Sequence, residues 1–259
     1  MDAAFLFSAL ASGGAIGLIL GLIGGGGSII AVPLLVYFVG VRSPHMAIGT
    51  AAVAVALNAV AGLAGHARAG TVKWPCALVF AAAGAAGAAL GAEAGKALDG
   101  TRLLALFGLM MVVVGVAMLR PRRSPENAGV RLRRDTAGHL LPRLIPAGLA
   151  VGLLAGFFGI GGGFLILPAL IFATGMPMRN AVGTSLVVVA ALGLTTAASY
   201  ALSGYIDWVL VALLVAGGAA GALAGIALGK RLARSRRARE IGFAALVIAM
   251  GGYVVWQGV

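Results

Sequence analysis

Ten apolar segments follow one another along this chain, in two groups of five. The break between the groups, RPRRSPENAGVRLRRD at residues 120–135, is polar and basic and includes two prolines. A helix of about 20 apolar residues crosses the ~30 Å hydrocarbon core of a bilayer. Because 61% of the residues are hydrophobic and only 10% are charged, we expect an all-α polytopic membrane protein. The segments are 3–23, 28–39, 46–65, 74–97, 103–119, 144–158, 163–174, 181–202, 208–229 and 241–256.

The second group of segments repeats the first. GLIGGGGSIIAVP aligns with GFFGIGGGFLILP, which places Gly24 against Gly159 at an offset of 135 positions. One residue is then missing from the second copy, and an offset of 134 pairs Thr50 with Thr184. A scaffold of glycine, proline and tryptophan kept in register indicates an internal duplication. We therefore predict three regions: a first membrane repeat at 1–119, a basic linker at 120–142 and a second membrane repeat at 143–259.

Five segments per repeat predict that the two halves are inserted in opposite orientations, because an odd number of crossings turns the second copy over. The distribution of basic residues supports this arrangement. With the linker in the cytoplasm, sixteen of the nineteen lysines and arginines fall on the cytoplasmic side, and only Arg42, Lys96 and Arg102 fall outside. The linker is therefore expected in the cytoplasm and both termini on the opposite side.

The second segment of each half is too short to cross a bilayer. Residues 28–39 and 163–174 are twelve residues each, and a helix of that length covers about 18 Å. We expect broken or re-entrant helical hairpins with their glycine-rich turns at membrane depth, facing protein or a water-filled cavity. Two pairs of spanning helices would give the same parity, so the charge pattern leaves both arrangements open.

The glycine runs before these short segments are the strongest candidates for a ligand site. Glycine adopts positive φ at little cost and lets a ligand approach the backbone, and a helix that starts there directs free N–H groups at an anion. Interrupted segments at matching positions of two halves are typical of transporter binding sites. Pro33 and Pro168 lack an N–H and are predicted helix-break positions. The predicted substrate-binding positions are Gly24, Gly25, Gly26, Gly27, Ser28, Gly159, Gly161, Gly162 and Gly163.

Uncharged polar residues in the third segment of each half could form a second wall of the site. Hydroxyl and amide groups donate hydrogen bonds to an oxyanion without carrying charge. Serine and threonine can instead bond to carbonyls of their own helix, and for Thr195 and Thr196 the two alternatives stay open. We predict four further substrate-binding residues: Thr50, Asn58, Thr184 and Ser185.

Other residues have simpler expected roles. The ridges Gly87, Gly91, Gly95 and Gly221, Gly225, Gly229 are typical of close helix packing, inside the chain or in a homodimer. His45 and Asn180 stand at helix starts, where we expect caps or interface residues. His66 and Tyr200 occupy equivalent positions near membrane boundaries, where we expect interfacial anchors, with gate residues as the alternative.

The sequence also argues against several classes of protein. The seven acidic residues lie outside the middle of any apolar segment, which disfavours a cation cage or a proton relay. One cysteine and three scattered histidines supply neither a metal cluster nor a nucleophile with its base, so we expect no enzyme activity, metal or cofactor. The basic residues lie between apolar segments, as in cytoplasmic loops, and no nucleic-acid partner is expected.

Two paired motifs carry a family resemblance. Each glycine run with its proline precedes an Ala-x-Gly-Thr sequence, AIGTA in the first half and AVGTS in the second. This pattern resembles the TauE/SafE sulfite exporter family over essentially the whole chain. The resemblance implies a bacterial or archaeal inner-membrane permease that moves sulfite, thiosulfate or organosulfonates. It carries functional positions onto Gly24 to Ser28, Pro33, Gly49, Thr50, Gly159 to Gly163, Pro168 and Gly183 to Ser185.

We therefore expect a secondary transporter that exports small sulfur-containing oxyanions by alternating access. The alternatives are an anion channel, an uptake permease for another small anion and a membrane accessory subunit that transports nothing. Its expected partners are a small inorganic or organic anion and the lipid bilayer, with homodimer formation left open. The sequence determines neither the direction of transport nor a coupling ion.

Overall fold

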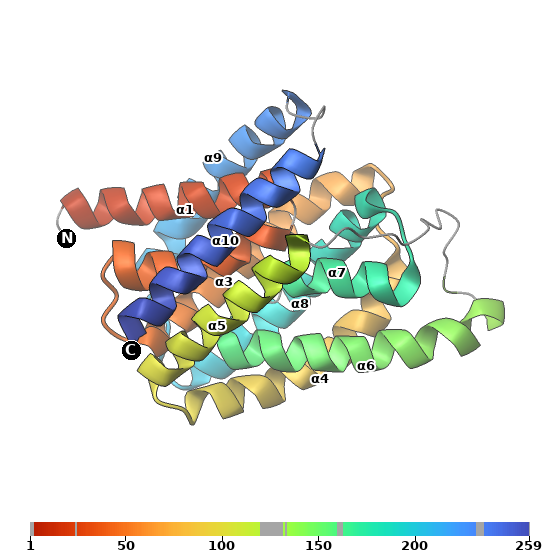
Figure 1. Cartoon of the computed structure of the whole chain (residues 1–259), viewed down its shortest axis with the longest axis horizontal. Coiled ribbons are helices and arrows are strands. Elements are labelled where there is room, and N and C mark those ends of the chain that lie inside the picture. Colours follow the sequence, from red (N-terminus) through yellow and green to blue (C-terminus); the bar gives the residue numbers. More distant parts are fainter. Residues whose placement is uncertain are drawn as a thin grey trace.

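The computed structural model of the chain describes residues 3–23, 25–119, 132, 134–159, 163–231 and 236–258, and these are helical apart from short connections (Figure 1). No strand occurs among them, which confirms the predicted all-α fold. The elements are α1 (Ala3–Ile23), η1 (Gly25–Ile30), α2 (Ala31–Pro33), η2 (Leu34–Phe38), α3 (Pro44–Arg68), α4 (Trp74–Lys96), α5 (Gly100–Leu119), α6 (Arg134–Phe158), α7 (Gly163–Thr174), α8 (Met178–Leu202), α9 (Trp208–Arg231) and α10 (Arg236–Gly258).

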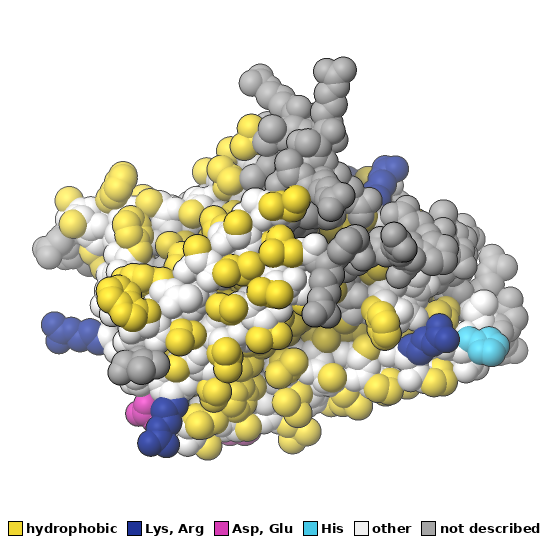
Figure 2. Space-filling view, in the orientation of Figure 1, with side chains coloured by type: hydrophobic (Ala, Val, Ile, Leu, Met, Phe, Trp, Pro, Cys, Tyr) yellow, Lys and Arg dark blue, Asp and Glu magenta, His cyan; other side chains and the backbone are white. Residues whose placement is uncertain are grey.

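Seven helices in the described part of the chain are long and apolar enough to cross a membrane: α1, α3, α4, α5, α6, α8 and α9. Large apolar side chains remain on the outside, among them Phe172 and Leu202, which are 88% and 92% exposed. Figure 2 shows hydrophobic side chains over most of one face, with charged side chains at its margins. An apolar surface of this extent fits a lipid environment.

The start of α6 differs most from the boundary expected from hydropathy. Helix α6 begins at Arg134, ten residues before the expected start at 144 and inside the region predicted as linker. Its first turns carry exposed polar side chains such as His139 and Arg143, and an apolar window does not detect a helix that continues into polar surroundings. As a result α6 is a candidate span over Thr136–Phe158, longer than the marginal segment expected.

The segment after the first glycine run is helical but irregular. It is a 3₁₀-helix over Gly25–Ile30, an α-helix over only Ala31–Pro33 and a π-helix over Leu34–Phe38. The equivalent α7 is a regular α-helix with Pro168 inside it. Long 3₁₀ stretches and π turns are uncommon and often occur at functional sites. The two short segments thus differ in backbone conformation, although they align in sequence.

Equivalent helices of the two halves make reciprocal contacts. Helix α1 packs against α9 and α6 packs against α4, while α3 packs against α8 and α5 against α10. Helices α3 and α8 are the most buried of the candidate spans and form the centre. The first residues of α1 and α6 project from opposite ends of the molecule in Figure 1. Helices of each half therefore pack mainly against helices of the other half.

The glycine ridges lie within these exchanged pairs. A Cβ on Gly87, Gly91 or Gly95 of α4 would overlap a carbonyl oxygen of α6, at Leu149, Leu153 and Phe157 respectively. In α9, Gly221 and Gly225 lie equally close to the carbonyls of Gly14 and Leu18 in α1. These ridges bring helix backbones into contact inside the chain, which is the packing role expected for small residues in membranes.

Candidate functional site

Both glycine-rich turns lead into helices that fold back on the helix before them. In the first hairpin η1 packs against α1, where Gly27 sits so close to the Ile16 carbonyl that no Cβ would fit. In the second hairpin α7 packs against α6. Gly159 ends that α6 with φ +66°, and a Cβ there would overlap the Ile48 side chain of α3. A side chain at Gly27 or Gly159 would therefore force the hairpin away from its neighbour.

The two hairpins meet in the protein interior. Segment η1 contacts α7, and both contact α8, while η1 also contacts α3. Ser28 and Gly163, predicted as the helix starts nearest to substrate, are both buried, and Ser28 is fully buried. Gly25 and Gly26 lie in the first turn of η1. Three predicted site residues, Gly24, Gly161 and Gly162, lie outside the described residues.

The predicted ligands Thr50 and Thr184 each bind the backbone of the opposite half. The Thr184 Oγ1 atom accepts a 3.0 Å hydrogen bond from the Lys73 N–H, just before α4. The Thr50 Oγ1 atom accepts a 3.0 Å hydrogen bond from the Asp207 N–H, just before α9. We refer to these as the Thr184 contact and the Thr50 contact. Lys73 and Asp207 are themselves equivalent positions, so the two contacts are reciprocal.

The glycine of each Ala-x-Gly-Thr motif makes room for the same loop. A Cβ on Gly183 would lie 2.6 Å from Thr71 Oγ1, and a Cβ on Gly49 would overlap the Tyr205 carbonyl. Glycine and threonine together therefore dock the loop before the fourth helix of one half onto the third helix of the other. This explains the motif by packing and hydrogen bonding, and each threonine hydroxyl keeps its own proton to donate elsewhere.

Asn58 is the clearest difference between the two halves. Its amide is 5% exposed and lies against Gly218 of α9. The equivalent residue in α8 is Leu192, which lies in the same way against Gly84 of α4. No hydrogen bond to the Asn58 amide is formed among the described residues. An amide in this position is costly unless a water or a ligand bonds to it.

The remaining hydroxyls of the third helices divide into two groups. Ser185 Oγ donates to the Val182 carbonyl and Thr195 Oγ1 to the Ala191 carbonyl, both in α8 itself. Thr196 Oγ1 is buried and has no hydrogen-bond partner in the part of the chain that the structure describes. The same is true of Ser12 Oγ in α1, which the sequence argument missed. The available signal was that Ser8 and Ser12 are the two polar residues of an α1 that is otherwise apolar or glycine.

Among the described residues, the acidic groups cap helices or lie at the surface. Asp207 and Asp99 accept hydrogen bonds from the first N–H groups of α9 and α5, as helix caps do. The N–H groups of Arg102 and Thr101 lower the pKa of the exposed Asp99 carboxyl. Glu93 is largely exposed and pairs with Lys96 at 2.7 Å. No cluster of histidine, cysteine or carboxylate side chains that could hold a metal occurs among the described residues.

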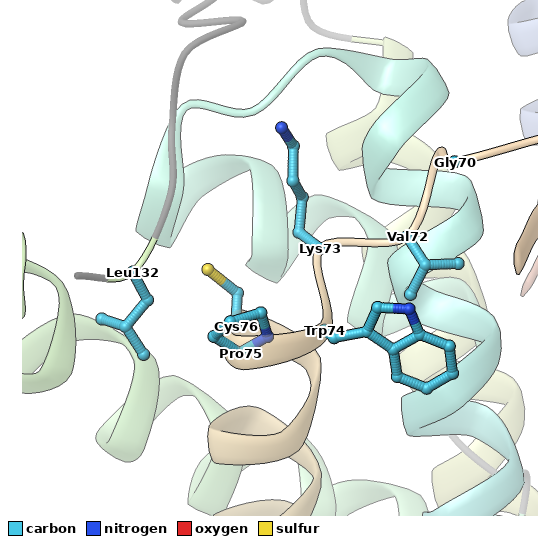
Figure 3. Close-up of a pocket in the computed structure, with 7 residues that line it drawn as sticks. All are labelled: Gly70, Val72, Lys73, Trp74, Pro75, Cys76 and Leu132. Atoms are coloured by element: carbon cyan, nitrogen blue, oxygen red, sulfur yellow. The ribbon is translucent and has the colours of Figure 1, made fainter.

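A surface hollow of about 380 Å³ adjoins the Thr184 contact (Figure 3). In the figure the Lys73 side chain extends from the loop in a different direction from the Trp74 ring. Lys73 places a positive charge at the edge of this hollow. The hollow is lined by Gly70, Val72, Lys73, Trp74, Pro75, Cys76 and Leu132.

These features define a class: a polytopic helical membrane protein built from two interlocked halves, with glycine-tipped hairpins meeting inside. The sequence profile of the sulfite exporter TauE/SafE family matches residues 9–254, and the chain belongs to this family. The family is one of membrane transporters, and this chain is a multi-pass member of it.

Named relatives cover most of the chain. A "probable membrane transporter protein" of Xylella fastidiosa strain Temecula1 is 46% identical over 252 residues, covering 97% of this chain and 95% of the relative. The "probable membrane transporter protein YunE" of Bacillus subtilis is 28% identical over 255 residues, covering 92% and 93%. One from Methanocaldococcus jannaschii is 26% identical over 186 residues, covering 67% and 66%. No solved structure matches the chain.

Proposed function

We propose that this protein is a secondary transporter that exports small sulfur-containing oxyanions, such as sulfite or organosulfonates, by alternating access. The observation that carries the proposal is the meeting of the two glycine-tipped hairpins between α3 and α8. Buried N–H and hydroxyl donors, with no buried carboxylate among the described residues, favour an anion over a cation. The proposed binding residues are those named from the sequence, with no catalytic group and no cofactor.

We further propose that the two halves are inserted in the bacterial inner membrane in opposite orientations. The linker is then cytoplasmic and both termini are on the other side, in agreement with the positive-inside rule. The reciprocal Thr50 and Thr184 contacts support this, because they join the halves at equivalent positions. Rocking of one half against the other would open one end of the molecule at a time.

The test is transport by the purified protein in proteoliposomes, with sulfite and a panel of organosulfonates. The informative variant is Asn58→Leu, because Leu192 already occupies the equivalent position and the substitution is sterically accommodated. If the Asn58 amide contacts the substrate, flux falls about ten-fold or more while the protein stays folded. The matched control is Thr195→Val, which removes a hydroxyl bonded only to its own helix and leaves flux unchanged.

The alternatives give different results in the same vesicles. A channel would show voltage-dependent conductance that does not saturate at low anion concentration. An uptake permease would move the anion from the non-cytoplasmic to the cytoplasmic face of the protein, whereas an exporter would move it the other way. An accessory subunit would give no flux for any anion in the panel and would co-purify with a partner, and that result would refute the proposal.

A further inference from the structure

Three aromatic rings lie together where the first turn of α3 meets the last turn of α8. The ring centroids of His45 and Tyr205 are 5.5 Å apart, those of Tyr200 and Tyr205 6.2 Å, and those of His45 and Tyr200 6.4 Å. The ammonium of Lys96 lies 5.9 Å from the centre of the Tyr200 ring. We refer to His45, Tyr200 and Tyr205 as the aromatic cluster.

The structure corrects two expected roles, the anchor role of Tyr200 and the cap role of His45. Tyr200 is completely buried, so it is not an anchor at the membrane surface. His45 does not cap α3, because Ser43 Oγ accepts the hydrogen bond from the Met46 N–H. The Tyr200 ring instead lies in the interior beside the rings of His45 and Tyr205. Sequence position alone could not distinguish these two directions.

Two polar atoms of the aromatic cluster are buried without a partner. Neither Tyr200 Oη nor His45 Nδ1 has a hydrogen-bond partner among the described residues. Leaving a buried donor or acceptor unpaired costs free energy, and native proteins usually pair such atoms with protein, water or ligand. The two atoms come from different helices of different halves, so the unpaired groups of both halves lie together in one place.

The opposite end of the molecule provides an internal comparison. Equivalent to Tyr200 and Tyr205 are His66 and Thr71, which follow the same backbone course: Thr71 N–H bonds to the His66 carbonyl as Tyr205 N–H bonds to that of Tyr200. There the side chains satisfy each other, with His66 Nδ1 and Thr71 Oγ1 3.0 Å apart and Thr71 Oγ1 donating to the His66 carbonyl. The side chains of this loop are therefore hydrogen-bonded to each other at the His66 end of the molecule, whereas at the Tyr200 end Tyr200 Oη has no hydrogen-bond partner among the described residues.

We propose that Tyr200 and His45 form an oxyanion-binding subsite at this end of the transport path, with the Tyr200 hydroxyl and the His45 ring nitrogen as hydrogen-bond donors. The inference rests on the transport function proposed above and adds a specific entry or exit step to it. His45 lies in the first turn of α3, where the helix dipole favours an anion. The Lys96 ammonium lies against the Tyr200 ring and is paired with the Glu93 carboxylate, so the proposed donors are the two uncharged groups. Tyr205 packs against both rings and holds them in position.

The experiment uses the four tyrosines of the full-length chain, replaced by 3-fluorotyrosine and observed by ¹⁹F NMR in nanodiscs. Single replacements by phenylalanine assign each resonance. Titration with sodium sulfite or sodium methanesulfonate should shift the Tyr200 resonance saturably, whereas sodium chloride should not. The Tyr253 resonance is the control, because its Oη already bonds to the Gln257 amide near the C-terminus. A Tyr200 resonance that does not respond at anion concentrations that support transport overturns the subsite.

Two variants of His45 test the subsite without relying on the Tyr200 resonance. Leucine and asparagine have the same shape, and only asparagine keeps a polar atom where His45 Nδ1 lies. His45→Leu should raise the anion concentration at half-saturation about ten-fold, while His45→Asn should stay close to the wild type. Equal midpoints for the two variants overturn the role of His45. If the wild type transports anions but these variants bind normally, only the subsite fails; if the wild type transports none, the proposed function fails as well.

Discussion

The Thr184 contact makes a prediction that can be followed through the single cysteine of the chain. Cys76 is fully buried in the first turn of α4, three residues after Lys73, whose N–H is bonded to Thr184 Oγ1. Thr184→Val keeps the shape of the side chain and removes the acceptor. An N–H left unpaired at a partly buried site costs about 1–2 kcal/mol, which multiplies the open population of the α4 start by roughly 5–30. The labelling rate of Cys76 by a maleimide under native conditions should rise by the same factor.

Two variants test this reasoning. Thr184→Ser retains the hydroxyl, and its labelling rate should stay within about two-fold of the wild type. Thr50→Val breaks the equivalent hydrogen bond to Asp207 at the other contact, and should leave Cys76 labelling unchanged although it destabilises the protein by a similar amount. Equal acceleration in Thr50→Val and Thr184→Val would mean that Cys76 is exposed by global unfolding, and the local role of the Thr184 contact would be wrong.

Three further predictions concern stability, measured as thermal unfolding in detergent. Gly91→Ala places a Cβ against the Leu153 carbonyl and should cost about 1–3 kcal/mol, whereas Gly252→Ala, with open space around it, should be neutral or stabilising by up to ~1 kcal/mol. Glu93→Gln removes the charge of a largely exposed carboxylate that pairs with Lys96 and should change stability by less than about 1 kcal/mol; a larger loss would mean that the pair is structural. Asn58→Leu removes a buried amide that has no hydrogen-bond partner among the described residues, so its unfolding temperature should equal or exceed that of the wild type, and a clear decrease would mean that the amide is hydrogen-bonded in the folded protein.

Much of the helix layout was predictable, because helix formation in a bilayer follows local properties. The expected segments 3–23 and 163–174 coincide with α1 and α7, and α4 and α9 begin at 74 and 208, where the expected segments begin. Hydropathy, glycine and proline influence helix formation only within a few residues along the chain, so helix positions can be predicted directly from the sequence. The start of α6 was predicted ten residues too late, since helix can continue outside the apolar window.

The candidate site could be predicted only in part. The sequence selected Thr50 and Thr184 as polar residues of the interior, and both are fully buried. It could not show that each accepts a hydrogen bond from a residue 157 or 111 positions away. It also missed Ser12, and it expected Tyr200 at the membrane surface rather than inside. In each case the outcome depends on which face of a helix meets another helix.

The sequence by itself determined that the chain is duplicated, helical and built for a membrane, and that two glycine-tipped segments are too short to span it. The tertiary structure decided which helices and residues of the two halves are in contact. The glycine ridges pack between halves, the Ala-x-Gly-Thr motifs hold loops of the opposite half, and the short segment after Gly25 is wound as 3₁₀ and π helix rather than α. The physical reason is range: hydropathy and backbone preference act along the chain, whereas hydrogen-bond partners and burial are fixed by contacts between residues more than a hundred positions apart.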